Sequence, residues 1–264
     1  MKKIILVLMF IPVFMCHGQD FPFSLDLKKD LIIGGVGVGL AAGQLVSYSL
    51  SDEKSAMKHG LDRFHKSDVF FLDRAMMQPY SKGLDITGDI LMCTMLAAPV
   101  CLAWRQDLSD IITLGAMYAE TLLIANGLKE IMKVNVDRYR PYCYYDDTRH
   151  SLLKEKDASR SFFSGHSTMA FASAAFISTA YWNMYPDGNS KYWITGGSFA
   201  MAAATGAFRI ASGCHFFTDV LTGAAVGTLT GWLVPYLHLN RADDMDLAFI
   251  SDSGKPGLVF NLRR

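Results

Sequence analysis

Six long apolar segments recur along the chain, and charged or polar connections separate them. They cover residues 31–50, 86–104, 111–128, 169–185, 192–208 and 220–239. Each is close to the ~20 residues that an α-helix needs to cross the hydrocarbon core of a bilayer. None alternates apolar and polar positions in the way of a half-buried strand. The pattern therefore predicts an all-α protein, a six-helix antiparallel bundle that spans a membrane.

Ionisable residues are rare inside these segments. Asp89 lies in the second segment, Glu120 in the third, and His238 at the end of the sixth. A carboxylate inside a membrane is costly, so we expect Asp89 and Glu120 to face the bundle and hydrogen-bond to a neighbouring helix, with a role in substrate binding as the minority alternative. A histidine at a helix end suits the membrane interface or the helix dipole, and we interpret His238 in that way.

Two of the segments carry a glycine at every fourth position. These are Gly35, Gly39 and Gly43 in the first segment and Gly223, Gly227 and Gly231 in the sixth. Glycines at this spacing line one face of a helix and allow a second helix to approach closely. We therefore expect both helices to use their glycine faces for close packing.

Both ends of the chain differ from the apolar middle. Lys2 and Lys3 precede a short apolar run and the small Gly18, which is typical of a secretory signal peptide over residues 1–18. Lipid attachment at Cys16 is a weaker alternative, because bulky residues precede that cysteine. Residues 19–240 then form the helical domain, and 241–264 form a polar tail in which a turn at 255–257 allows a small hairpin.

Composition narrows the possible partners. The chain is 51% hydrophobic and 19% charged, and its 25 basic and 25 acidic residues cancel. A neutral chain has no overall field to attract nucleic acid, so we expect no nucleic-acid partner, and any basic site must be local. Cys93 and Cys101 lie in an apolar segment and are expected to be buried thiols, whereas Cys143 and Cys214 could pair in an exported protein.

Chemically capable residues cluster at the ends of the predicted helices. The clusters are Lys133 with Arg140 after the third helix, Ser164-Gly165-His166 before the fourth, and Arg209, His215 and Asp219 between the fifth and the sixth. In an antiparallel bundle these helix ends share one side. Counting helices therefore predicts that all three clusters converge on one face.

The converging residues suit a phosphate group. Three cations lying together are costly unless an anion joins them, and arginine matches phosphate oxygens. Backbone N–H groups of Ser164 and Gly165, at a helix start, would add donors. His215 and Asp219 are four residues apart, so the carboxylate can orient the imidazole as a nucleophile, and His166 could protonate the leaving oxygen. This chemistry requires no metal and no cofactor, and the chain carries no zinc-type spacing of cysteine and histidine.

These three clusters together resemble the motifs of the type 2 phosphatidic acid phosphatase and vanadium haloperoxidase superfamily. The resemblance implies a phosphohistidine on His215, with His166 as the acid and Asp219 as its orienting partner. It also implies a phosphate cradle formed by Lys133, Arg140, Arg209, Ser164 and Gly165. Phe163 stands where the family usually has proline and Phe208 where it usually has serine. Neither position supplies the nucleophile or the acid, so we expect activity to survive these departures.

The predicted function is therefore a metal-independent phosphatase for a phosphomonoester or diphosphate of a membrane lipid. Phosphatidic acid, phosphatidylglycerol phosphate, undecaprenyl diphosphate and the phosphate of lipid A are all compatible with the sequence. The alternatives are a soluble periplasmic acid phosphatase, a vanadate-dependent haloperoxidase and a non-catalytic lipid-binding bundle. The partners are the lipid phosphate and the bilayer, and the sequence does not indicate an oligomeric state.

The side of the membrane is ambiguous. A cleaved signal followed by three crossings would put the active face in the cytoplasm, and the basic loops 51–82 and 133–163 agree with that. The family resemblance implies an external site instead. We predict a cell-envelope protein of bacterial type with its active site facing the periplasm or exterior.

Overall fold

A computed structural model describes residues 21–50, 64–145, 156–240, 245–252 and 255–262. The predicted signal peptide over 1–18 lies outside the described residues. In this part of the chain there are seven α-helices: α1 (Leu27–Leu50), α2 (Phe71–Met76), α3 (Lys82–Ala97), α4 (Leu108–Asn135), α6 (Gly165–Met184), α7 (Ser190–Ala211) and α8 (Phe217–Leu237). Short 3-10 helices cover Lys66–Asp68, Ala98–Ala103, Pro141–Tyr144 and Lys156–Ser159.

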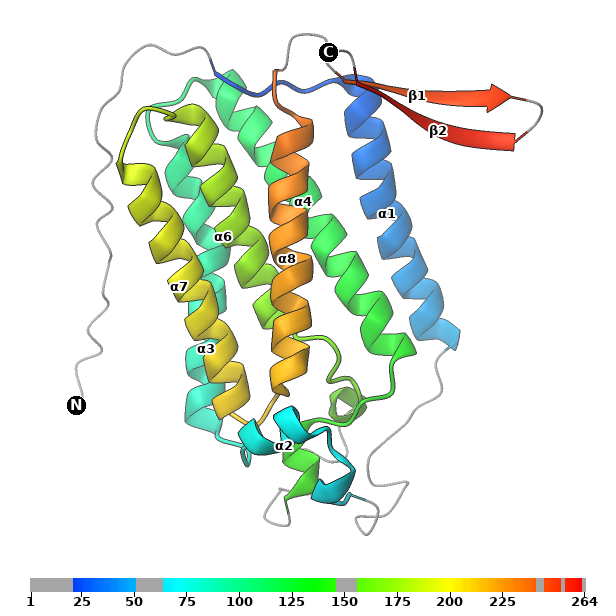
Figure 1. Ribbon diagram of the computed structural model, residues 1–264, viewed down its shortest axis with the longest axis vertical. Helices are drawn as coiled ribbons and strands as arrows, with labels where there is room; N and C mark the ends of the chain where they lie inside the picture. The colour runs from blue at the N-terminus through cyan, green and yellow to red at the C-terminus, as the bar shows by residue number, and fades with distance from the viewer. Residues whose placement is uncertain (1–20, 51–63, 146–155, 241–244, 253–254, 263–264) are drawn as a thin grey trace.

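The six long helices form an up-and-down bundle (Figure 1). Helices α1, α4 and α7 end at the end drawn at the bottom of Figure 1, called the lower end below, and α3, α6 and α8 begin there. Helix α6 contacts α3, α4, α7 and α8, whereas α1 packs mainly on α4. The predicted antiparallel order of six long helices is thus the order observed, and the short α2 lies across the lower end as a seventh helix.

A two-stranded antiparallel hairpin follows the bundle. Strand β1 (Met245–Asp252) pairs with β2 (Lys255–Leu262), with Met245 opposite Leu262 and Asp252 opposite Lys255. The predicted hairpin is therefore present, but the turn predicted at 255–257 is wrong, because these residues form the start of β2. It projects from the upper end of the bundle, far from the helix ends that carry the motifs (Figure 1).

The glycine repeat of α8 packs as predicted. A Cβ on Gly223 would lie 2.6 Å from the carbonyl oxygen of Ser164, and Cβ atoms on Gly227 and Gly231 would collide with the backbone of Thr168 and Ala172. Close approach of α8 to α6 thus depends on the absence of these side chains. The contact holds the beginnings of the two helices side by side.

The glycine repeat of α1 does not pack in this way, and that prediction is wrong. A Cβ on Gly35 or Gly39 would meet nothing within 4 Å. The close contact between α1 and α4 instead uses Gly127 of α4, where a Cβ would lie 2.5 Å from that of Leu40. Spacing alone cannot show which face of a helix has a neighbour.

Among the residues that the structure describes, four helical stretches are long and apolar enough to cross a membrane: Leu27–Ser47, Lys82–Ala103, Leu108–Asn135 and Phe217–Leu237. Their outward faces expose large apolar side chains such as Leu31, Ile90 and Leu229, which suits lipid rather than water. The prediction that all six segments have the length and hydropathy of membrane spans is only partly confirmed. Helices α6 and α7 carry many small and hydroxyl residues, because α6 in particular is enclosed by other helices and needs small side chains for packing.

Candidate active site

The predicted site residues come together at the lower end of the bundle. His215 lies in the turn between α7 and α8, and its Nε2 is 3.2 Å from Nη1 of Arg140, which follows α4. His166 occupies the second position of α6, and Arg209 lies in the last turn of α7. The convergence predicted by counting helices is therefore observed.

A glycine shapes the turn that carries His215. Gly213 has a φ of +72°, a left-handed conformation that other residues adopt at a cost. A Cβ at this position would lie 2.5 Å from the carbonyl oxygen of Gln78. The carbonyl oxygen of Gly213 also accepts a hydrogen bond from the N–H of Tyr142, at 3.1 Å. The turn is thus fixed between the segment before α3 and the segment after Arg140.

His215 is oriented as a nucleophile. Arginine can only donate, so the contact from Arg140 means that Nε2 of His215 is the acceptor and Nδ1 carries the proton. Nδ1 lies 3.6 Å from Oδ2 of Asp219 and has no hydrogen-bond partner within the described part of the chain. Burial, together with the charges of Arg140 and Arg209, holds the pKa of His215 well below 6.5. The side chain is therefore neutral at pH 7, with a lone pair on Nε2.

Asp219 is held by several donors at the start of α8. Its Oδ2 accepts hydrogen bonds from Oγ of Ser161 at 2.6 Å and from the N–H of Phe216 at 2.9 Å. Its Oδ1 pairs with the guanidinium of Arg138. The carboxylate is completely buried, so these donors determine where it points.

Arg138 lies in the segment that joins Lys133 to Arg140. The structure places it between two fully buried carboxylates, because Nη1 pairs with Asp219 and Nη2 lies 2.5 Å from Oδ2 of Asp73. Asp73 also accepts hydrogen bonds from the N–H and hydroxyl of Thr218, at 2.9 and 2.8 Å. Sequence reasoning missed Asp73, since it lies in a charged loop with no motif.

The cations of the site have counter-ions that the sequence did not place. Arg140 is buried and donates to the carbonyl oxygens of Asp157 and Cys214, each at 2.9 Å, and to the Asp157 carboxylate at 2.5 Å. Arg209 is also buried and pairs with the carboxylates of Asp85 and Asp89. The premise that unpaired cations require an anion is therefore wrong for Arg140 and Arg209. The carboxylates instead orient the guanidinium groups in advance.

Arg209 has one hydrogen-bond donor that its carboxylate partners do not use. Its Nε is buried and has no hydrogen-bond partner among the described residues. Asp89 and Asp157, which neutralise Arg209 and Arg140, have side chains that are 53% and 56% exposed. Exposed carboxylates can turn away into water, so an incoming anion can take over contacts that they now make.

His166 presents a proton at the mouth of the site. A carboxylate can only accept, so the 2.7 Å contact between Nε2 of His166 and Oδ1 of Asp89 places a proton on Nε2. The expectation that Asp89 hydrogen-bonds to a neighbouring helix is met, through α6 and also through Arg209 of α7. Its partner in α6 is the proposed acid itself.

The two backbone N–H groups that we expected to bind an anion, those of Ser164 and Gly165, are not equally free to do so. The N–H of Ser164 donates to the carbonyl oxygen of Asp219 at 3.1 Å, so it is not free for an anion as we expected. Gly165 begins α6, where a backbone N–H has no partner within the helix. A Cβ on Gly165 would lie 2.7 Å from Cδ of Lys129, so glycine also lets α4 approach closely.

Lys133, partly buried on α4, lies within electrostatic range of Arg140 and His215.

The four cysteines in the described part of the chain are free thiols, so the possible pairing of Cys143 with Cys214 is wrong. Cys143 and Cys214 are both free and buried, and their thiols face the carbonyl oxygen of Ala158 and the carboxylate of Asp85. Burial raises the pKa of Cys143 to about 12, which makes it a poor nucleophile for disulfide exchange. Cys93 and Cys101, which we expected to be buried, are exposed on the outside of the bundle.

Comparison with known proteins agrees with the motifs. A lipid A 1-phosphatase of Porphyromonas gingivalis is 38% identical over 82 residues, which are 31% of this chain and 17% of that protein, so the chain matches about a sixth of its relative's length. The crystal structure of a transmembrane PAP2 type phosphatidylglycerolphosphate phosphatase from Bacillus subtilis aligns with a TM-score of 0.44 and 20% identity, covering 80% of this chain and 94% of that one.

The family assignment rests on the part of the chain that contains the site. Residues 114–243 match the PAP2 superfamily. This range runs from within α4 to just beyond α8, and it includes every residue proposed for the chemistry. The helix ends that form the site therefore lie inside the matched region, and this region of the chain belongs to the PAP2 superfamily.

Proposed function

We propose that this protein is a metal-independent phosphatase that hydrolyses the phosphate of a membrane lipid through a phosphohistidine on His215. One observation carries the proposal. A neutral, buried histidine directs the lone pair of Nε2 toward Arg140, while its Nδ1 faces the buried carboxylate of Asp219. An imidazole held in this tautomer between a cation and a carboxylate is equipped to attack phosphorus.

The substrate phosphate would bind against the cations of the site. Arg140 is already aligned beside Nε2 of His215, and the unpartnered Nε of Arg209 supplies a second donor. Lys133 adds positive charge from α4, and the start of α6 at Ser164 and Gly165 adds its helix dipole. These groups stabilise the charge that develops on the phosphoryl oxygens, which is the task a metal performs in other phosphatases.

In the first step, Nε2 of His215 attacks phosphorus in line with the leaving oxygen. The N–P bond forms as the P–O bond to the alcohol breaks. His166 enters this step protonated on both ring nitrogens and transfers its Nε2 proton to that oxygen, which leaves a neutral imidazole. Asp219 faces the Nδ1–H of His215 and stabilises the positive charge that the ring acquires. Its 3.6 Å separation from Nδ1 would shorten as this charge develops.

In the second step, water hydrolyses the phosphohistidine. His166, now neutral at Nε2, accepts a proton from the water as its oxygen bonds to phosphorus and the N–P bond breaks. Inorganic phosphate leaves, and both histidines return to their starting states. Asp89 lies 2.7 Å from Nε2 of His166 and would stabilise its protonated form before the first step and after the second.

A lipid substrate is supported by the surroundings of the site. Four helices have the length and hydropathy of membrane spans. Beside the site, α2 exposes Phe71, Leu72 and Met76, with Phe70 just before it, while the buried Asp73 ties the same helix to α8 through Thr218. An apolar outer face next to the phosphate site suits a substrate whose tail remains in the bilayer. The name of the Porphyromonas gingivalis relative, a lipid A 1-phosphatase, is in line with this class.

We further propose that the site faces the periplasm or exterior. All the proposed residues lie at one end of the bundle, so a single reporter there is decisive. A cysteine replacing exposed Lys66, introduced into a chain whose other cysteines are serine, should react with a membrane-impermeant maleimide in intact cells. Labelling only after the cells are broken would place the site in the cytoplasm and contradict this orientation.

The activity is tested with purified protein in detergent and mixed micelles of lipid phosphates. His215→Ala should lower phosphate release by more than about 10³-fold, as expected for loss of a nucleophile. His65→Ala, an exposed histidine near the same end, is the matched control and should retain wild-type rates. Near wild-type release by His215→Ala would refute the mechanism.

Further assays separate the alternatives. EDTA should leave turnover intact, and vanadate should inhibit it. Activation of halide oxidation by vanadate would indicate a haloperoxidase instead. Comparable rates on a water-soluble phosphomonoester and on lipid phosphates would argue against a lipid substrate.

A further inference from the structure

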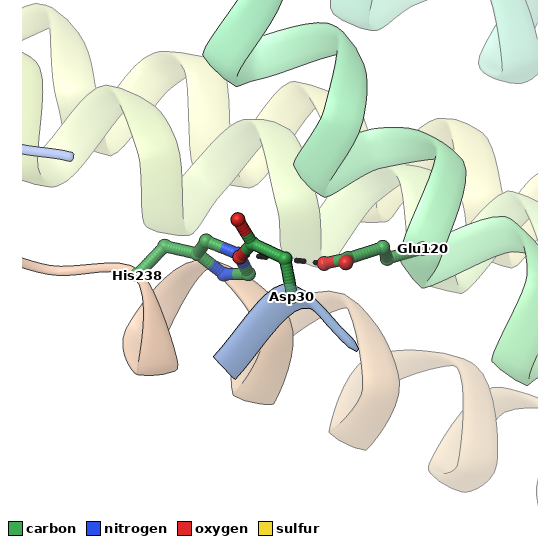
Figure 2. Close-up of side chains that lie close together, drawn as sticks. All are labelled: Asp30, Glu120 and His238. Carbon is green, nitrogen blue, oxygen red and sulfur yellow. Dashed lines mark hydrogen bonds and ion pairs between the residues drawn. The ribbon is translucent and has the colours of Figure 1, made fainter. Parts of the chain in front are cut away.

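Three ionisable side chains meet near the upper ends of α1 and α8, away from the proposed phosphatase site. His238 caps the C-terminus of α8, Asp30 lies in the first turn of α1, and Glu120 lies within α4 (Figure 2). One ligand atom from each of the three lies within 4.8 Å of the other two. Helix α8 rises about 1.5 Å per residue, so His238 is roughly 28 Å along it from Asp219.

The ring of His238 is oriented by the backbone. Nδ1 lies 2.8 Å from the carbonyl oxygen of Val234, and a carbonyl can only accept, so Nδ1 carries a proton. This leaves Nε2 facing the carboxylates, 3.0 Å from Oδ1 of Asp30 and 3.4 Å from Oε2 of Glu120. A metal-binding histidine typically donates its other ring N–H to a carbonyl in this manner.

Glu120 shows that the cluster is incomplete by itself. The residue is only 9% exposed, and its Oε2 is buried with no hydrogen-bond partner among the described residues, although it points at His238. His238 is almost fully buried as well. Without a cation, a neutral Nε2 and two carboxylates would bring three acceptors together with no donor between them. A buried acceptor without a donor is costly.

The charges and distances suit a divalent metal ion. Two carboxylates and a neutral imidazole carry a charge of −2, which a divalent cation neutralises. Bonds of about 2.0–2.2 Å in a tetrahedral site separate neighbouring ligand atoms by roughly 3.3–3.6 Å. The observed separations of 3.0 and 3.4 Å from Nε2 are close to this range.

From this geometry we propose that Asp30, Glu120 and His238 bind a divalent transition-metal ion such as Zn²⁺, which joins α1, α4 and α8 at the upper end of the bundle. Mixed nitrogen and oxygen ligands suit this class of metal. The site is structural, because it lies far from the proposed phosphatase chemistry. It was hidden from sequence analysis, since 30, 120 and 238 form no motif and the fold alone brings them together.

The test is metal binding by the full-length, tag-free protein in detergent after EDTA treatment and dialysis. Titration calorimetry with Zn²⁺ should show one saturable site per chain. Asp30→Asn, Glu120→Gln and His238→Gln, which keep the side-chain shapes, should each weaken binding by about tenfold or more, since even indirect contacts to a metal matter by that amount. His65→Gln removes an exposed histidine instead and should bind Zn²⁺ as the wild type does.

Two further readouts do not depend on the variants. Co²⁺ bound to the wild-type protein should give the visible absorption of a low-symmetry, four- or five-coordinate site. Zn²⁺ should also raise the Tm of the wild-type protein, while turnover in the phosphatase assay stays the same with or without it. If no saturable Zn²⁺ binding is found, or if all three variants bind as the wild type does, the cluster is a histidinium held between two carboxylates and the proposal is overturned.

Discussion

Replacing Arg138 by methionine tests how the orienting carboxylate is held. Arg138 is the shared partner of Asp219 and Asp73, both completely buried, and its own side chain is 24% exposed. Arg138→Met keeps the side-chain length and leaves two buried carboxylates without their cation. Breaking one buried ion pair costs about 3–5 kcal/mol, and the partial exposure of Arg138 favours the lower end of this range.

The expected loss of stability is therefore about 3 kcal/mol, or a fall of roughly 6–12 °C in Tm for a chain of this size. Differential scanning fluorimetry of the detergent-solubilised protein measures it. We also expect kcat to fall, because Asp219 loses a donor that fixes its position beside His215, while KM changes less since Arg138 does not contact the proposed phosphate position.

A second substitution separates stability from catalysis. Asp73→Asn in the Arg138→Met background removes one of the two uncompensated charges, so part of the lost Tm should return. The kcat should remain low, because Asp219 still lacks Arg138. An unchanged Tm in Arg138→Met, or recovery of kcat together with Tm in the double variant, would refute this account of Arg138.

Three further predictions concern packing, pH and anion binding. Gly227→Ala should lower Tm, at a cost of about 1–3 kcal/mol for overpacking, because the new Cβ collides with the backbone of Thr168, whereas Gly35→Ala faces open space and should not lower it. The acidic limb of the kcat/KM profile should lie below pH 6.5, because protonation removes the nucleophile and the pKa of His215 is lowered; a limb at or above 6.5 would contradict the burial of this ring. Asp89→Asn should tighten inhibition by vanadate about fivefold, since removing a half-exposed negative charge near the anion is worth about 1 kcal/mol, while unchanged or weaker inhibition would show that Asp89 does not compete with the anion.

The helical layout was predictable because it depends on local pattern. Apolar runs of about twenty residues predict long helices, and consecutive antiparallel helices place alternate ends on one side. His215 and Asp219 could be paired from the sequence since four residues separate them at a helix start. A small hairpin in the tail was also predicted, but its turn was misplaced, because residues 255–257 pair with β1 as the start of β2.

The carboxylate partners of the arginines at the site could not be predicted from the sequence in this way. Asp73, Asp85 and Asp157 lie in segments without motifs, yet the fold sets them against Arg138, Arg209 and Arg140. Charge pairing over such sequence separations depends on how helices and loops meet in space. A count of cations at the predicted site therefore overestimated its free positive charge.

The sequence by itself determined the long helices, their antiparallel order and the end of the bundle that carries Lys133, His166 and His215, because periodicity and helix direction are local properties. Only the tertiary structure decided which glycine repeat packs, which donors remain open to an anion, and that Asp30, Glu120 and His238 meet at the other end. The physical reason is the same in each case. A side chain's partners are determined by the helix face it occupies and by the neighbour that covers that face, and neither is encoded by spacing along the chain.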